Sequence, residues 1–197
     1  MSDRALDELD REDMARLAKG DEASLDDLMG RHSERLFHYL LRIVQDETDA
    51  SDLAQETFVR VYQNRTRFER ERKFSTWLYA VATNLARDRL RWRSRHPEVA
   101  LEAERSERDP DFHGMLPSPG ASPSEALVAE ERGEMVRRAV AALPEDLRIP
   151  LILTQFEERS HIEVATILDC TPKAVEMRVY RARQQLRNQL SSVMKDV

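Results

Sequence analysis

The chain has 197 residues, of which 41% are hydrophobic and 35% are charged. This length and composition support one or two small hydrophobic cores and exclude a single large one. No apolar run approaches the roughly 18 residues that a membrane span requires, and the first residues, Met1-Ser2-Asp3-Arg4, show no signal-peptide pattern. We therefore expect a cytoplasmic protein without membrane insertion.

Residues typical of catalysis, metal binding and disulfide formation are sparse. Cys170 is the single cysteine, so no internal disulfide can form, and the five histidines are dispersed. There is no glycine-rich phosphate loop, no nucleophile with a paired base and no cluster of metal ligands. We therefore expect neither an enzyme nor a cofactor or metal.

The net charge of −6 conceals a block pattern. Residues 1–64 carry 8 basic and 16 acidic side chains, and residues 97–170 carry 7 and 16. Residues 65–96 carry 10 basic and 3 acidic side chains, and residues 171–197 carry 6 basic and 2 acidic ones. Either basic block alone could be a solvated helix face, but two of them, each in a helix-forming segment, favour a polyanion bound at two places.

Helices are expected along most of the chain, because glycines are few and Ala, Leu, Glu and Arg are frequent. Gly20-Asp21 is typical of a helix end followed by a cap, and a long amphipathic helix is predicted from about Glu22 to Val44. The next two helices are predicted from Asp49 to Asn64 and from Ser75, a plausible cap, to Arg95. The later helices are predicted at 124–142, 144–156, 160–168 and 172–192.

The helix at 49–64 has an apolar and a polar half. At 100° per residue, one half carries Ala50, Leu53, Ala54, Thr57, Phe58 and Val61. The other half carries Asp49, Asp52, Glu56 and Gln63. Such a polar half is either a solvated surface or a docking face for a basic surface on a protein partner.

A basic loop, residues 65–73, precedes the next helix and contains Phe68. Arginines and an aromatic ring suit an unstacked base, because every base offers a π-face and arginine binds the backbone. Ordinary core packing is the alternative for Phe68 and Trp77. The helix itself is expected to bury Phe74, Leu78, Val81, Leu85 and Trp92. It is expected to project Thr83, Asn84, Arg87 and Arg91 away from the core.

From Pro97 to Ser124 the apolar periodicity stops and prolines and glycines accumulate, which indicates an extended linker. The chain divides there into an N-terminal domain, residues 1–96, a linker, residues 97–124, and a C-terminal domain, residues 125–197. We predict an all-α fold of two small helical domains joined by a flexible linker.

Residues 161–180 fit a helix-turn-helix register. Ala165 is small where the two helices would cross, and Asp169 occupies a turn position that needs a left-handed backbone. Thr171 can cap the second helix, and Pro172 suits its first position. The outward residues of the second helix are expected to be Lys173, Met177, Tyr180, Arg181, Gln184 and Arg187. A purely structural helical hairpin with an arginine-rich surface is the alternative.

Two runs in the first half, Asp49-Ala-Ser-Asp-Leu-Ala-Gln-Glu-Thr-Phe58 and Phe74-Ser-Thr-Trp-Leu-Tyr-Ala-Val-Ala-Thr-Asn84, carry a family resemblance. They resemble the polymerase-binding and promoter-melting portion of extracytoplasmic-function sigma factors of the sigma-70 family. Leu143-Pro144, residues 160–165 and residues 175–183 resemble the helix-turn-helix of the same family. The resemblance covers about residues 10–95 and 125–190, in order and with a linker between them.

The resemblance implies a stress-response factor that binds core RNA polymerase and directs promoter-specific initiation. The residues that would bind the clamp coiled coil of the largest polymerase subunit are Asp49, Asp52, Gln55 and Glu56. Those at the −10 strand would be Phe68, Asn84, Arg87 and Arg91. Those at the −35 element would be Lys173, Glu176, Met177, Arg178, Tyr180 and Arg181. The polymerase flap and an anti-sigma factor are further implied partners, and the linker would run toward the polymerase active-site channel.

Two features limit what the resemblance transfers. Glu176 and Met177 stand where family members often have Lys or Arg followed by Ser, so base preference is not carried over. The alternative function is a conventional helix-turn-helix regulator, which would explain residues 160–190 but not the ordered motifs at 49–84. A regulator shifts duplex DNA alone, whereas a sigma factor needs core polymerase.

Overall fold

The computed structural model describes residues 3–69, 71–96 and 133–193, and within them all regular structure is helical. The N-terminal helices are α1 (Asp3–Ala18), α2 (Ala23–Val44), α3 (Glu47–Gln63), the short 3₁₀ helix η1 (Arg65–Arg67) and α4 (Phe74–Arg95). The C-terminal helices are α7 (Glu145–Gln155), α8 (His161–Leu168) and α9 (Pro172–Val193), preceded by helical residues 133–141. The predicted linker 97–124 lies outside the described residues, as does the start of the predicted helix 124–142. The predicted all-α fold is confirmed.

Helix α2 is the centre of the N-terminal half, with Leu36, Leu40 and Ile43 fully buried on its apolar face. The chain reverses at Gln45, whose left-handed backbone (φ 58°) ends α2. Asp46 then begins α3, since its carboxylate accepts a hydrogen bond from the backbone N–H of Asp49 at 2.7 Å. This tight connection sets α3 beside α2.

Charged side chains attach α1 to α2. Asp10 is buried, and its two carboxylate oxygens lie 3.0 Å from Arg31 Nε and 2.8 Å from His32 Nε2. Asp13, also buried, forms ion pairs with Arg16 and Arg31. Because each buried carboxylate has a cationic or hydrogen-bonding partner, the charges of α1 are tolerated against the core.

Helix α4 crosses α2 through a buried polar contact. Thr83 Oγ1 donates to the carbonyl of Tyr79 at 2.6 Å, so the hydroxyl of Tyr39 donates to Thr83 Oγ1, also at 2.6 Å. Thr83 is fully buried, and its predicted outward position is wrong. The expected cap Ser75 is wrong too, because Lys73 is the N-cap residue and Ser75 lies inside the first turn of α4.

The C-terminal half forms the predicted helix-turn-helix from α8 and α9. A capping box begins α8, with the Ser160 hydroxyl and the Glu163 carboxylate each accepting from the other's backbone N–H. Asp169 has the expected left-handed backbone (φ 50°), and Thr171 Oγ1 accepts from the N–H of Ala174 at 3.2 Å. These local signals confirm the turn predicted from sequence.

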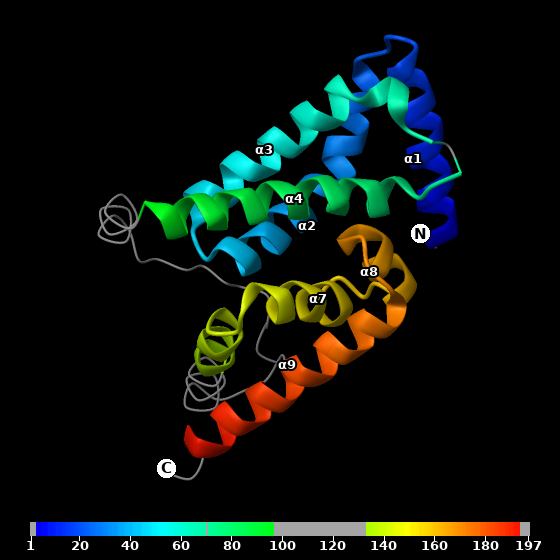
Figure 1. The fold of residues 1–197 in the computed structure, drawn as a ribbon. Helices are drawn as coiled ribbons and strands as arrows, with labels where there is room; N and C mark the ends of the chain where they lie inside the picture. Colours follow the sequence, from blue (N-terminus) through cyan, green and yellow to red (C-terminus); the bar gives the residue numbers. More distant parts are fainter. Residues whose placement is uncertain (1–2, 70, 97–132, 194–197) are drawn as a thin grey trace, which may run out of the picture.

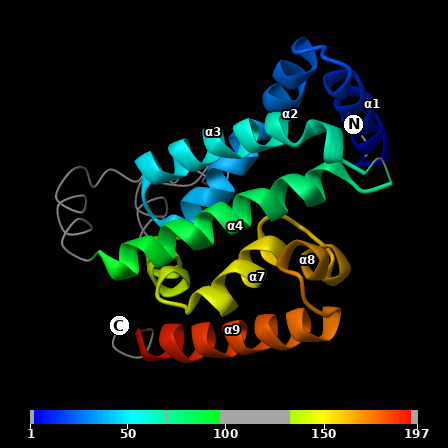
Figure 2. The same cartoon turned by 45° about the horizontal axis from the view of Figure 1, so that its top comes forward.

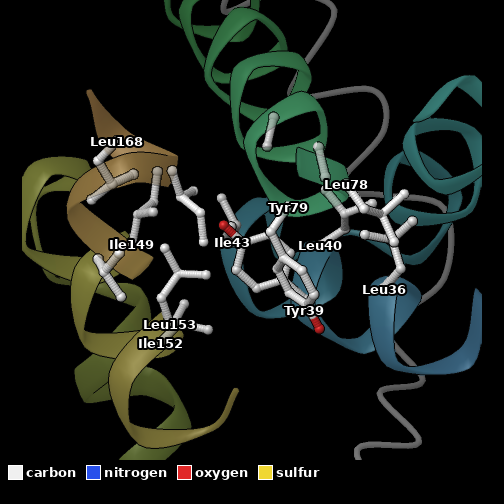
Figure 3. Packing of buried hydrophobic residues seen from close by; sticks show 14 of the residues in the cluster. Leu36, Tyr39, Leu40, Ile43, Leu78, Tyr79, Ile149, Ile152, Leu153 and Leu168 are labelled. Carbon is white, nitrogen blue, oxygen red and sulfur yellow. The ribbon is translucent and has the colours of Figure 1, made fainter. Parts of the chain in front are cut away.

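The two halves pack directly on each other. As Figures 1 and 2 show, the C-terminal half lies beside the N-terminal half: α8 packs against α4, α7 packs against α2, and α9 lies on the far side of α7. Figure 3 shows apolar residues of α7 and α8, such as Ile149 and Leu168, facing Ile43 and Tyr79 of the N-terminal half. All four of these side chains are buried and belong to one hydrophobic cluster. One continuous core therefore joins both halves.

Among the described residues, no helix is long and apolar enough to cross a membrane. The same part of the chain holds no group of three or more His, Cys, Asp or Glu side chains placed to bind a metal ion.

Candidate functional site

Three of the four residues predicted to bind polymerase line a groove between α3 and α4. Its α3 side is formed by Asp52, Leu53, Gln55, Glu56, Val59 and Arg60. Its α4 side is formed by Leu85, Asp88, Arg89 and Trp92. Asp52 and Gln55 are exposed, and Glu56 is half-buried with an Arg60 partner at 2.6 Å. The groove thus combines carboxylates and two arginines with apolar surface.

Val59 and Trp92 supply that apolar surface, and sequence periodicity missed both. Trp92 is 45% exposed, so its predicted core position is wrong. Its ring stacks on His96 with the ring centroids 4.7 Å apart, beyond the end of the buried part of α4. Val59 is 46% exposed and interrupts the polar half of α3. In the sequence, the one signal for this apolar surface was Val59, an apolar residue within the polar face of α3.

Asp49 does not share the exposure of its predicted neighbours. It is buried at the start of α3 and forms ion pairs with Arg89 and Arg93 of α4, the latter at 2.6 Å. Burial raises the pKa of Asp49, and the guanidinium groups of Arg93 and Arg89 oppose this shift. In this conformation Asp49 links α3 to α4 through ion pairs, and its side chain is buried.

Replacing Asp49 with Asn should therefore destabilise the N-terminal half, because Arg89 and Arg93 lose their shared carboxylate. The expected loss is about 2 kcal/mol in the free energy of unfolding, or roughly 4–8 °C in Tm. Thermal unfolding followed by circular dichroism measures it, with exposed Asp52→Asn as the matched control. Equal Tm values for both variants would contradict the fastening role.

The predicted −10 strand residues occupy three different environments. Phe68 is half-buried, with its ring centroid 5.3 Å from that of Trp77 and 6.1 Å from that of Phe74. Asn84 is exposed on α4. Arg91 is also exposed and pairs with Asp88 at 3.1 Å.

Arg87 is held by the C-terminal half. Its Nε donates to Glu145 Oε1 of α7 at 3.1 Å, and only 19% of its side chain is exposed. The expectation that Arg87 projects freely away from the core is therefore wrong for this conformation. The reason is that Glu145, the first residue of α7, reaches this side of α4, which the periodicity of α4 alone could not indicate.

The predicted −35 residues lie together on α9. Lys173, Glu176, Met177, Tyr180 and Arg181 are all exposed, whereas Val175, Val179 and Ala182 on the other side of the helix are buried. Arg178 is half-buried on the flank, with its guanidinium 3.8 Å from Cys170 Sγ in the turn. The exposed residues form a basic face with one acidic member, Glu176.

Two family models match the chain, and they cover the two halves separately. Residues 28–96 match the sigma-70 region 2 model, and residues 133–186 match the sigma-70 region 4 model. The extracytoplasmic-function (ECF) RNA polymerase sigma factor SigW of Bacillus subtilis is 33% identical over 173 residues, 87% of this chain and 91% of that protein. The chain belongs to the sigma-70 family, in its ECF group.

Further relatives of this sigma factor match over nearly its whole length. The RNA polymerase sigma-H factor of Pseudomonas aeruginosa is 31% identical over 96% of this chain and 97% of its own. The ECF RNA polymerase sigma-E factor of Escherichia coli is 30% identical over 91% of this chain and 93% of its own length. Region 2 precedes region 4 in this chain, in the order that the sequence motifs predicted.

Solved structures confirm the fold of the sigma factor. CnrH, solved in complex with the cytosolic domain of CnrY, superposes with a TM-score of 0.67 and 26% identity over 93% of this chain and 98% of CnrH. The sigma factor RpoE of Bartonella quintana, solved with the anti-sigma factor NepR, superposes with a TM-score of 0.62. Its match covers 84% of this chain and 96% of RpoE at 20% identity, so it supports the fold alone.

Proposed function

We propose that this sigma factor binds core RNA polymerase through the α3–α4 groove, captures the −10 strand at α4 and reads the −35 element with α9. The observation that carries the proposal is the presence in one chain of two exposed surfaces, a groove of carboxylates, arginines and apolar side chains and a basic helix-turn-helix face. Its domains would be residues 1–96 and 125–197 with a linker at 97–124. The chain would act in the cytoplasm by binding and not by catalysis.

The groove suits a helical partner that carries basic side chains. Asp52 and Glu56 lie one turn apart on α3, and Trp92 offers a large ring beside them. Aromatic anchors surrounded by charged rims are typical of protein interfaces with strong central contacts. The occupant would be the clamp coiled coil of the largest polymerase subunit, with the polymerase flap contacting the C-terminal half.

The −10 strand would meet the exposed amide of Asn84 and the aromatic group around Phe68. Stacking on an aromatic ring contributes about 1–3 kcal/mol per base, enough to offset the unstacking of a flipped base. Arg91 lies on the same helix and, with Arg87 once Glu145 releases it, would bind the strand backbone.

The −35 element would lie in the major groove against the basic face of α9. Arginine can bind a guanine edge through two hydrogen bonds, so Arg181 is the candidate for direct base reading. Lys173 would contribute affinity through phosphate, which carries little sequence preference.

Runoff transcription with core polymerase on a genomic promoter library tests the proposal. The sigma factor should direct initiation at a defined set of promoters and should not shift promoter duplex in the absence of polymerase. Specific duplex binding by the free protein, without polymerase-dependent initiation, would instead identify a conventional helix-turn-helix regulator. An anti-sigma factor that covers the polymerase-binding surface is a further proposed partner.

Glu176 offers a test of −35 reading. Its carboxylate pairs with Lys173 Nζ at 2.9 Å, and that hydrogen bond lowers the pKa of Glu176. Substitution Glu176→Lys removes a charge that repels phosphate and also frees Lys173. We expect the holoenzyme to bind DNA in general more tightly and to show an altered preference at one or two −35 positions. The slope of log affinity against log salt concentration should become more negative by roughly 1–2.

Selection of randomised −35 sequences with the holoenzyme measures that preference. Asp26→Lys, the same charge change at an exposed position of α2, is the control. If Glu176→Lys and the wild type select the same motif, Glu176 does not contact bases.

A further inference from the structure

Helix α1 ends before residue 28, where the match to the region 2 model begins. Its inner face follows helical spacing through Asp10, Met14 and Leu17. Met14 and Leu17 are buried, as such a face requires, but Asp10 is fully buried as well. Replacing a buried charged pair with apolar side chains is often neutral or stabilising, so stability alone does not explain a carboxylate at this position.

Asp10 fixes the ring of a buried histidine. Its Oδ2 lies 2.8 Å from Nε2 of His32, which is 7% exposed. Its Oδ1 accepts from Arg31 Nε at 3.0 Å, so the carboxylate is itself held in place. Because an imidazole nitrogen forms its hydrogen bond close to the plane of the ring, this contact sets the orientation of the His32 ring.

The His32 ring lies at the base of an aromatic group. Its centroid is 5.3 Å from that of Phe74. The Phe74 ring lies 6.1 Å from Phe68 and 6.2 Å from Trp77, in both cases with its edge directed at the neighbouring face. The centroids of Phe68 and Trp77 are 5.3 Å apart. These four rings, here called the ring cluster, connect buried Asp10 to Phe68, the ring proposed to stack on a flipped −10 base.

The ring cluster runs from the core to the surface beside α1. Phe74 is fully buried, whereas Phe68 and Trp77 are half-buried. Helix α1 packs against both η1 and α4, and Figures 1 and 2 show it beside the start of α4. Aromatic pairs favour particular relative orientations, so a ring fixed at the buried end restricts the rings that follow it. A ring that is already ordered loses little freedom when a base stacks on it.

A second carboxylate of α1 joins the same two helices through arginine alone. Asp13 is 4% exposed and forms an ion pair with Arg31 of α2. It also pairs with Arg16 of its own helix. Neither partner is aromatic, so Asp13 holds α1 to α2 without fixing a ring. The chain therefore offers a matched control for Asp10.

We propose that Asp10 and His32 are positioning residues for promoter opening. Asp10 fixes the His32 ring, and that ring supports Phe74. Phe74 in turn holds Phe68 ready to stack on the flipped base. The inference rests on the proposed function. Both positioning residues are buried and lie outside the α3–α4 groove, so their loss should affect strand opening and leave polymerase binding unchanged.

Two substitutions at position 10 test the hydrogen bonds. Asp10→Ala removes both of them. Asp10→Asn can keep both, because the amide oxygen can accept from Arg31 while the amide nitrogen donates to His32 Nε2. In holoenzyme–promoter complexes, Asp10→Ala should reduce permanganate reactivity at the −10 element by about 5–10-fold, the loss of one well-placed ring contact. Asp10→Asn should match the wild type, and both variants should compete normally for core polymerase.

Asp13→Ala and His32→Leu separate positioning from general stability. Asp13→Ala also removes a buried carboxylate between α1 and α2 and should lower Tm as Asp10→Ala does, yet it should open promoters normally. His32→Leu removes the ring and should impair opening as Asp10→Ala does. If Asp10→Ala fails to fold by circular dichroism, His32→Leu decides the same question. Equal losses of opening in Asp13→Ala and Asp10→Ala, or normal opening in His32→Leu, would overturn the proposal.

Trp77 fluorescence tests the ring cluster in the free full-length protein. With Trp92→Phe, Trp77 is the single tryptophan of the chain. Asp10→Ala in this background should shift Trp77 emission to longer wavelength and increase its quenching by acrylamide, whereas Asp13→Ala should change neither. Unchanged emission and quenching in Asp10→Ala would overturn the positioning role. Failure of the wild-type holoenzyme to open promoters, in contrast, would count against the proposed function and leave the fluorescence result standing.

Discussion

Reversing the charges of Asp52 and Glu56 should weaken binding to core RNA polymerase by roughly 10–100-fold, equivalent to about 1.4–2.8 kcal/mol. Both residues line the α3–α4 groove, and neither supports the core. The double variant Asp52→Lys/Glu56→Lys would turn the acidic side of the groove basic, so it would repel a basic partner. Competition against labelled wild-type sigma factor for core polymerase measures the loss.

The control carries the same charge change elsewhere. Glu12→Lys/Glu34→Lys alters two exposed acids on α1 and α2, outside the groove, and should leave polymerase affinity within twofold. Glu56→Lys also removes the pair with Arg60, which costs the helix only about 0.5 kcal/mol. Matched Tm values would show that the folded state is retained. Equal affinity of the reversed variant and the wild type would remove the groove from the polymerase interface.

Trp92 gives the same interface a second, uncharged test. Truncation to Ala should weaken polymerase binding without any change in net charge, because a large exposed ring beside the carboxylates would be covered by the partner. Since the ring stacks only on His96 among the rings of the described residues, little core packing is lost.

Helical periodicity predicted the buried faces of α3 and α9 well, because each of these helices packs mainly on one side. Leu53, Phe58 and Val61 of α3 are buried, as are Val175 and Val179 of α9. The turn of the helix-turn-helix was also predictable, since Asp169 and Thr171 act through bonds to neighbours a few residues away. The capping box was available from the same kind of local signal, Ser160 followed three residues later by Glu163.

Helix α4 was the least predictable element, because it is packed on two sides. Thr83 is buried against Tyr39, and Arg87 is held by Glu145, although a single-sided helix would expose both. Likewise, Asp49 belongs to the polar half of α3 by spacing but pairs with arginines 40 or more positions away. Such pairs depend on how helices cross, which the local order of residues does not encode.

The contact between the two halves could not be predicted from local sequence patterns for the same reason. Glu157 lies 122 residues from Arg35, and the residues between them include the predicted linker. The charge blocks predicted a polyanion bound at the two basic regions and no contact between the halves. The structure pairs Glu145 with Arg87 and Glu163 with Lys73, while Glu157 contacts Arg35 and Arg42 of the acidic region 1–64.

Substitution of Asn84 by Ala should impair promoter opening far more than it impairs polymerase binding. Asn84 is exposed on α4 and contributes nothing to the buried core, so its loss should leave the fold and the α3–α4 groove intact. A base flipped from the duplex is bound by stacking and by hydrogen bonds to its edge, and the amide of Asn84 can supply such bonds. Losing them should reduce the population of open complex by roughly tenfold, corresponding to about 1.4 kcal/mol.

Phe68 requires a more careful substitution than Asn84, because its ring packs near Phe74 and Trp77. Phe68→Leu keeps most of the apolar volume and removes the π-face, so it separates stacking on a base from packing in the domain. Permanganate footprinting of holoenzyme–promoter complexes measures strand opening, and Asn188→Ala on α9 provides an exposed amide control. Both Asn84→Ala and Phe68→Leu should show weak permanganate reactivity at the −10 element with normal polymerase affinity. Normal strand opening in both variants would place the capture site elsewhere on the chain.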